Sequence, residues 1–178
     1  GLPVLSMKEA GVSLDIEENG ATFGENAEIK ARAVWERTGG IVLADDSGLA
    51  VDYLGGEPGI YSARYLGEDT SYEVKNRVII DRLKGVEGAA RSARFVCNIA
   101  AVMPDGSVLH TEETMEGRIA EEPAGSGGFG YDPILWLEEF KKTSAEITME
   151  EKNQISHRGK ALRAMKEELV GWLGKEKA

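Results

Sequence analysis

The chain has 178 residues, 42% hydrophobic and 29% charged, a composition typical of one globular domain, so we expect a single domain over residues 1–178. Its 31 acidic and 21 basic residues leave a net charge of −10, which disfavours binding to the phosphates of nucleic acid. No apolar run approaches the roughly 20 residues that span a membrane, so we expect no membrane partner.

The first predicted element is a helix that starts at Thr22. Thr22 and Glu25 have the spacing of a capping box, and Gly39 with the glycine after it is a stop signal. Small apolar residues recur on one face of this helix, and Lys30 lies on the same side. The pattern predicts a helix packed on a core, with one lysine beside the packed face.

A short apolar strand is predicted over residues 41–44, followed by the letters DDSG and a second apolar stretch over residues 49–51. Asp45 and Asp46 therefore end an apolar run as two adjacent anions. Such a pair resists desolvation, so we expect a metal ion, a basic partner or open solvent to compensate it. Ser47 and Gly48 would then open a tight turn whose amides face an anion.

The second half of the chain mixes helices and strands. A hairpin is predicted because the turn signal Pro-Asp-Gly separates two apolar, alternating runs. Mixed helices and strands with an antiparallel hairpin indicate an α/β or α+β domain with a mixed sheet. The predicted elements are a helix from a cap at Thr70 to about 83, strands over 91–103 and 107–115, a glycine-rich loop over 123–133, and a helix from about 156.

The glycine-rich loop GSGGFG formally matches the dinucleotide-binding pattern, but no apolar strand precedes it and no helix follows it. It also lacks the lysine of a phosphate-binding loop. One interpretation is a plain connector. The other is a ligand loop in which Phe129 and Tyr131 stack on a flat ring and Asp132 accepts hydrogen bonds from that ring.

The segment EEKNQISHRGK is the most basic short stretch of an acidic chain. It reads either as a solvated helix start or as a recognition site built on Lys152, His157 and Arg158. Because arginine carries only hydrogen-bond donors, Arg158 suits a carbonyl and mismatches an exocyclic amine. A purine with a 6-oxo group would thus be separated from adenine.

The acidic pairs are the candidate metal ligands. Hard carboxylate oxygens without clustered cysteine or histidine favour Mg²⁺, which also binds substrate phosphates. Glu17 and Glu18 precede the first helix, and Asp45 and Asp46 end the strand. The alternative is ordinary surface charge on a loop and a turn.

Four segments, in this order, resemble the Ham1-type inosine triphosphate pyrophosphatases: TFGENAEIKAR, LADDSGLAVDYLGGEPGIYSARY, EPAGSGGFGYDPI and EEKNQISHRGKAL. The resemblance implies an elongated α/β fold with a mixed central sheet, helices around it and a cleft between two lobes, usually in a homodimer. It also implies Mg²⁺-dependent hydrolysis of 6-oxo purine nucleoside triphosphates (ITP, dITP or XTP) to the monophosphate and pyrophosphate, which removes them from the nucleotide pool.

Site residues follow from the same resemblance. Asp46 matches the general base and a metal ligand, and Glu18 or its neighbour Glu17 matches the other metal carboxylate. The resemblance assigns the substrate contacts to Lys30 and Ser47 near the phosphates, Phe129, Gly130, Tyr131 and Asp132 in the nucleotide loop, and Lys152, His157 and Arg158 at the base.

One feature of the family has no counterpart before Glu17: the opening strand and the T/S-x-N-x-x-K loop that cradles the triphosphate. We therefore expect an N-terminally truncated domain with reduced stability and weak or absent activity. The alternatives are an inactive nucleotide-binding relative and a pyrophosphatase for another modified nucleotide. A single cysteine and no signal peptide predict a cytoplasmic setting, with Cys97 as a buried thiol.

Overall fold

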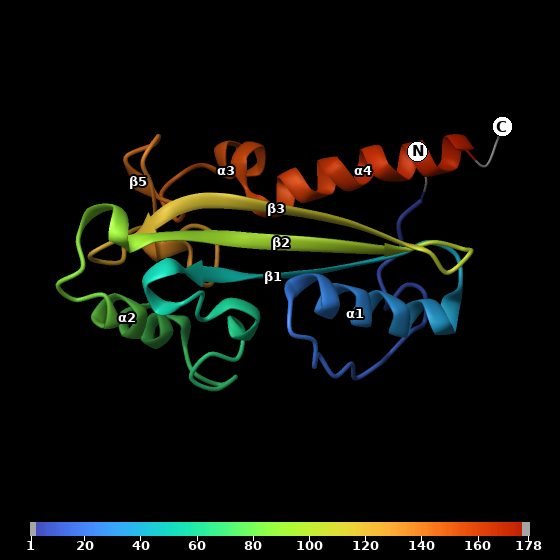
Figure 1. Cartoon of the computed structure of the whole chain (residues 1–178), viewed down its shortest axis with the longest axis horizontal. Coiled ribbons are helices and arrows are strands. Elements are labelled where there is room, and N and C mark those ends of the chain that lie inside the picture. The colour runs from blue at the N-terminus through green and yellow to red at the C-terminus, as the bar shows by residue number, and fades with distance from the viewer. Residues whose placement is uncertain (1–2, 176–178) are drawn as a thin grey trace. The chain divides into compact units, whose positions relative to one another are not determined.

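The structure, a computed structural model, describes residues 3–175 (Figure 1). None of the helices in this range is both long enough and apolar enough to cross a bilayer. The helices are α1 (Phe23–Thr38), α2 (Tyr72–Arg82), α3 (Met149–Ile155) and α4 (His157–Lys175), and the strands are β1 (Val42–Val51), β2 (Ser92–Val102), β3 (Val108–Ile119), β4 (Leu135–Leu137) and β5 (Lys142–Thr143).

The strands form one sheet in the order β1-β2-β3-β4-β5. The predicted hairpin is confirmed: β2 and β3 are joined by a turn in which the Met103 N–H donates to the Ser107 carbonyl at 2.8 Å. β4 pairs antiparallel with both β3 and β5. The α/β class is therefore confirmed, and neighbouring strands of the described sheet run antiparallel (Figure 1) where a mixed sheet was expected.

The chain divides into two compact units, and β1, β2 and β3 contribute residues to both. Unit 1 contains the residues up to Asp46, then Asn98–Glu112, then α4 from Ala161 on, and unit 2 contains Ser47–Cys97 and Glu113–Lys160. Each unit has its own apolar core. In unit 1, Ala27 and Ala31 of α1 pack on Ala100 and Val102 of β2.

The core of unit 2 is larger, and α2 packs on strands β2, β3 and β4 in it. Cys97 is buried, as expected. The fully buried core residues of unit 2 include Leu49, Val51, Ile79, Leu83, Ala93, Ile134 and Leu135.

Helix α1 begins and ends close to the predicted residues. The Thr22 side chain accepts a hydrogen bond from the Glu25 N–H at 3.1 Å, while the Glu25 carboxylate accepts from the Ala21 N–H. Gly39 ends the helix with φ +62°, and its N–H donates to the Trp35 carbonyl. Thr22 therefore caps the helix as predicted, and the reciprocal bond is shifted by one residue.

The predicted turn at Asp-Asp-Ser-Gly is wrong, because β1 runs without interruption from Val42 to Val51. Pairing with β2 keeps these turn-forming residues extended. Side chains alternate along a strand, so Asp45 and Asp46 point to opposite faces of the sheet. The electrostatic repulsion that an adjacent pair suggests is reduced by this geometry, and the turn amides expected at Ser47 and Gly48 do not form.

Helix boundaries differ from prediction at two other places. Ser71, not Thr70, caps α2, and the Thr70 hydroxyl donates instead to the Leu66 carbonyl. The basic segment contains a separate short helix, α3, which starts at a capping box between Thr148 and Glu151. Lys152 therefore lies in α3 and the later basic residues lie in α4.

Candidate active site

A cluster in unit 1, which we call the carboxylate cluster, joins Glu18, Lys30 and Asp46. The Lys30 ammonium donates to Glu18 Oε1 at 2.9 Å and to Asp46 Oδ1 at 3.1 Å. Lys30 comes from α1, Asp46 from β1, and Glu18 from the extended segment before α1. One lysine thus gathers two carboxylates from separate parts of the chain.

Burial controls the electrostatics of this cluster. The Asp46 side chain is only 12% exposed, and this burial raises the pKa of Asp46 even though the positive charge of Lys30 opposes the shift. Burial also acts on Lys30, where it lowers the pKa, but the hydrogen bond to Glu18 and the charge of Asp46 leave that pKa raised. The lysine therefore stays protonated, while Asp46 is a stronger base than a surface aspartate.

Asp46 retains an unused acceptor. Its Oδ2 atom is buried and has no hydrogen-bond partner among the described residues. The nearby Asn26 amide slightly opposes the effect of burial on the pKa of Asp46, but it makes no hydrogen bond to Oδ2. A buried carboxylate oxygen of this kind favours a cation or a hydrogen-bond donor from outside the chain. Glu18 and Asp46 therefore fit a divalent metal whose other ligands are water or phosphate oxygens.

The carboxylate cluster is no closed metal cage. Nowhere in residues 3–175 do three histidine, cysteine, aspartate or glutamate side chains gather as metal ligands. Such an open, carboxylate-poor arrangement is what Mg²⁺ tolerates, because it keeps several of its waters.

The structure also separates the two candidate glutamates. Glu18 is half-buried and reaches Lys30, whereas Glu17 is exposed. Asp45 is likewise set apart from Asp46 by the alternation of β1. Ser47 follows Asp46 within the same strand.

A second cluster, which we call the loop cluster, lies in unit 2 around Asp132. The Asp132 carboxylate accepts hydrogen bonds from the Lys152 ammonium at 2.5 Å, the Ser144 hydroxyl at 2.7 Å and the Phe129 N–H at 2.8 Å. Its side chain is 3% exposed. Both Asp132 oxygens therefore help to hold the surrounding loop, and the predicted contact of Asp132 to a ligand ring stays a prediction.

The glycines of this loop are needed for close approach. A Cβ atom at Gly128, where φ is +67°, would overlap the Asp132 carboxylate. A Cβ atom at Gly125 would lie 2.6 Å from the Ala145 backbone carbon. The loop over residues 125–132, the glycine loop below, can wrap around Asp132 only because these side chains are absent.

The two aromatic residues of the glycine loop face different surroundings. Phe129 is 69% exposed, and the Lys152 ammonium lies 5.1 Å from the centre of its ring. Tyr131 is buried, packs edge-on against Tyr72 and donates from its hydroxyl to the Ser62 carbonyl at 2.5 Å. Phe129, not Tyr131, is therefore available to stack on a flat ligand.

The remaining basic residues lie at the start of α4. His157 is buried, and its ring stacks on Phe95 at 5.0 Å between ring centres. Arg158, the next residue, is exposed. Of this pair, the structure presents Arg158 to solvent and uses His157 in packing.

Two residues that support the loop cluster were not predicted from the sequence. Ser144 bonds Asp132, and Asn76 of α2 donates to the Gly130 carbonyl at 3.1 Å. Ser144 carries no signal in the sequence. Asn76 does, because asparagine is a poor residue for the interior of a helix.

The comparisons with known proteins point to one family. A model of the Ham1 family matches residues 1–168. The chain is 48% identical over 165 residues to the dITP/XTP pyrophosphatase of Bacillus licheniformis, covering 93% of this chain and 84% of that protein. It is 52% identical over 158 residues to that of Treponema denticola, covering 87% of this chain and 80% of that protein.

Among solved structures, the Ham1 protein of Staphylococcus aureus superimposes with a TM-score of 0.85 at 41% identity. That match covers 93% of this chain and 84% of the other. A HAM1 protein from Coxiella burnetii gives a TM-score of 0.83 at 42% identity, covering 89% of this chain and 81% of the other.

Proposed function

The chain belongs to the Ham1 family, and on that premise we propose that it hydrolyses non-canonical purine nucleoside triphosphates (ITP, dITP and XTP) to the monophosphate and pyrophosphate. Relatives named dITP/XTP pyrophosphatase, at about half identity over most of the chain, support this substrate class. The observation in the structure that carries the proposal is Asp46, a buried carboxylate with a raised pKa and an unused oxygen beside Glu18 and Lys30.

The chemistry assigned to Asp46 is general base catalysis. A water molecule attacks the α-phosphorus, Asp46 takes its proton, and the bond from the α-phosphorus to the bridging oxygen breaks so that pyrophosphate leaves. A raised pKa improves the carboxylate as a proton acceptor near neutral pH. Lys30 stays positively charged and offsets charge on the polyphosphate, because transfer at phosphorus depends mainly on positioning and charge stabilisation.

The cofactor in this proposal is Mg²⁺, held by Glu18 and Asp46. When bound, it neutralises negative charge on the phosphate oxygens. The unpartnered Asp46 Oδ2 and the neighbouring Glu18 carboxylate support this assignment. Glu17 is exposed and is the weaker candidate.

Recognition of the base is assigned to unit 2. The exposed Phe129 ring stacks on the purine, and Arg158 donates to its 6-oxo group. Adenine presents an amine at that position, so Arg158 disfavours ATP. Asp132 and Lys152 hold the loop that carries Phe129.

The test is a product analysis in water enriched in ¹⁸O, with ITP, XTP, dITP and ATP as substrates and with or without Mg²⁺. We expect equal amounts of monophosphate and pyrophosphate from the first three, with ¹⁸O only in the monophosphate. Inorganic phosphate and a nucleoside diphosphate would contradict attack at the α-phosphorus. No product from any of the four would favour a nucleotide-binding chain without turnover.

We also assign the chain to the cytoplasm and to a homodimer. A buried free cysteine suits a reducing compartment. Exposed aromatic residues between β1 and α2, Tyr53 and Tyr61, suit a subunit contact. Light scattering coupled to size-exclusion chromatography tests the dimer, and a monomer at micromolar concentration would contradict it.

A further inference from the structure

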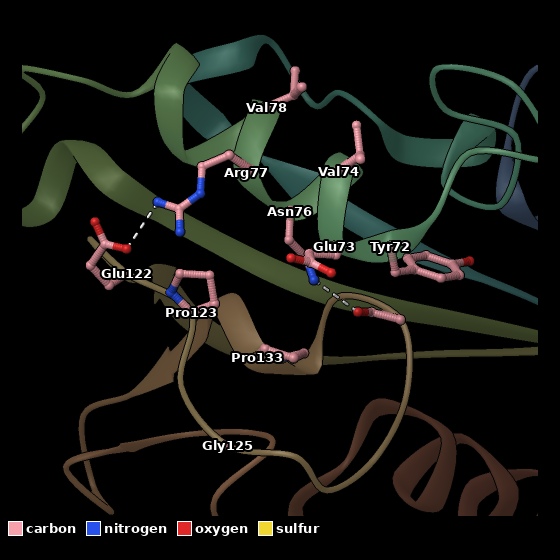
Figure 2. A pocket seen from close by; sticks show the side chains of 11 residues that line it. Tyr72, Glu73, Val74, Asn76, Arg77, Val78, Glu122, Pro123, Gly125 and Pro133 are labelled. Atoms are coloured by element: carbon pink, nitrogen blue, oxygen red, sulfur yellow. Dashed lines mark hydrogen bonds and ion pairs between the residues drawn. The ribbon is translucent and has the colours of Figure 1, made fainter.

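Helix α2 is tied to the glycine loop by Asn76. The Asn76 amide nitrogen donates to the Gly130 carbonyl at 3.1 Å, which is the dashed line from Asn76 in Figure 2. Because this nitrogen must face a carbonyl, the orientation of the amide is fixed. Its oxygen, Oδ1, then faces the other way and has no hydrogen-bond partner among the described residues.

This arrangement is costly for a residue whose role is only structural. Asn76 is 4% exposed, so Oδ1 has lost its water without gaining a donor. Asparagine is also a poor residue inside a helix. An apolar side chain at this position would join the buried Ile79 and Ile80 of the same helix without either cost. The amide is therefore explained by what it does to Gly130, not by stability.

Gly130 lies between the exposed Phe129 and the buried Tyr131, at a point of the loop that borders a hollow. Gly128 and Gly130 adopt left-handed backbone angles, with φ +67° and +61°, and glycine gives the chain its greatest freedom. This hollow of about 660 Å³ lies between α2 and this part of the chain, beside the contact of Asn76 with Gly130 (Figure 2). Its walls include Tyr72 and Asn76 of the helix and Pro123, Gly125, Gly130 and Pro133 of the chain around the loop.

Side chains form hydrogen bonds with the backbone at Phe129 and at the residue after it. Asp132 holds the Phe129 N–H, and Asn76 holds the Gly130 carbonyl one residue later. With the Asn76 bond removed, the Gly130 carbonyl loses its side-chain donor and borders a hollow into which it can move. The hydrogen bonds of Asp132 to Phe129 and of the Tyr131 hydroxyl to a backbone carbonyl remain. The position of the Phe129 ring thus depends on a residue that is far from it in the sequence.

We propose that Asn76 is a positioning residue of the nucleotide site, which holds the glycine loop so that Phe129 is presented to the base. The positioning step concerns the loop alone. The consequence for nucleotide affinity rests on the function proposed above. Loss of the Asn76 amide weakens nucleotide binding and leaves the chemical step and the fold intact.

The main variant is Asn76→Leu, which removes both the bond to Gly130 and the unpartnered oxygen. Its matched control is Val74→Leu, which places the same new residue on the same helix and changes no side-chain hydrogen bond, because the Val74 side chain is half exposed and points away from the loop (Figure 2). We expect Asn76→Leu to raise KM for ITP about tenfold with kcat within about twofold, the effect of losing one hydrogen bond used in binding. Its Tm should equal or exceed that of the wild type.

A second measurement needs no activity. Hydrogen–deuterium exchange of peptides over residues 125–132 should become about tenfold faster in Asn76→Leu and stay unchanged in Val74→Leu. A third variant, Asn76→Asp, places a carboxylate opposite the Gly130 carbonyl. The ratio of its KM to the wild-type KM should fall toward one as the pH is lowered, because the protonated acid again donates to that carbonyl.

The outcomes are distinct. Wild-type KM and wild-type exchange in Asn76→Leu overturn the proposal, as does a fall in Tm that parallels a fall in kcat, since that result marks a structural role. If the wild type releases no pyrophosphate, the proposed function fails. Exchange of residues 125–132 then still decides whether Asn76 positions the loop.

Discussion

The carboxylate cluster and the loop cluster each pair a lysine with a buried aspartate, but the two aspartates differ in what they still need. Asp46 shares Lys30 with Glu18, has one unpartnered oxygen and has a raised pKa. Asp132 forms an ion pair with Lys152 that no second carboxylate of the described residues shares, and both of its oxygens accept hydrogen bonds from the chain. The first cluster has one lysine for two carboxylates and leaves one oxygen without a donor, whereas the second has one lysine for one carboxylate and donors on both oxygens.

This difference suggests a chemical role for the carboxylate cluster and a positioning role for the loop cluster. A buried carboxylate without enough partners favours a cation and takes up a proton readily, which are the properties of a catalytic base beside Mg²⁺. Asp132 instead accepts three hydrogen bonds from its own surroundings, which fixes the carboxylate and the loop around it. Substitutions in the carboxylate cluster should therefore change kcat, and substitutions in the loop cluster should change KM.

The largest effect is expected for Asp46→Asn. The amide keeps the shape of the side chain but removes the base and a metal ligand, so kcat for ITP should fall by about 10³-fold or more. The Tm should not fall at neutral pH, because burial disfavours the charge that is removed. Steady-state kinetics and thermal unfolding measure both quantities, and turnover within tenfold of the wild type would remove Asp46 from the mechanism.

A smaller loss is expected for Lys30→Met, with kcat/KM for ITP about 100-fold lower. Without Lys30, Glu18 and Asp46 face each other with no cation between them, so the Tm should fall. Mg²⁺ should then raise the Tm by more than it does in the wild type. The control is Lys152→Met in the loop cluster, which should gain nothing extra from Mg²⁺, and an equal gain in both variants would contradict the assignment of the metal.

Asp132→Asn should act on binding. The Lys152 ammonium loses its carboxylate, so we expect KM for ITP to rise about tenfold, kcat to stay within about twofold, and the free energy of unfolding to fall by about 1–3 kcal/mol. Ser144→Ala removes one of the three hydrogen bonds and should give a smaller change in the same direction. A loss of kcat as large as that of Asp46→Asn would erase the distinction between the clusters.

The smallest effect is expected for Arg158→Ala, as a change in selectivity. The ratio of kcat/KM for ITP to that for ATP should fall about tenfold, since the donor for the 6-oxo group is lost. Arg163→Ala, five residues further along α4, is the control, because Arg163 is also an exposed arginine of that helix. An unchanged ratio in Arg158→Ala would show that the base is recognised elsewhere.

The parts of the fold predicted from the sequence are those governed by local signals. Thr22 and Gly39 mark the ends of α1 because capping acts between near neighbours, and Pro-Asp-Gly marks the β2–β3 turn for the same reason. Thr148 and Glu151 show that a signal can also be overlooked, since their capping box is visible in the sequence. The prediction failed at Asp45 and Asp46, where pairing with β2 overrides local turn preference.

The same division holds for the site. Motifs predicted which residue types would carry the chemistry, but the direction of each side chain depends on register and packing. Glu17 and Glu18 differ only in which way the extended segment turns them. In the sequence Tyr131 is a candidate stacking ring, whereas in the structure it is buried and its hydroxyl donates to the Ser62 carbonyl. The orientation of such side chains is determined by tertiary contacts, which cannot be read from a single sequence.

The central claim is that Asp46 is a buried base that a cation completes, and a titration of the Asp46 carboxyl by carbon NMR tests it most directly, with Asp46→Asn to assign the signal. Without Mg²⁺ the pKa should lie above its ordinary value of 3.8, so the folded state holds the proton more tightly than the unfolded state. The stability that Asp46 contributes is then present below pH 3.8 and is lost as the pH rises through the folded pKa. Mg²⁺ should lower that pKa. A pKa at or below 3.8, or one that Mg²⁺ leaves unmoved, would contradict the claim.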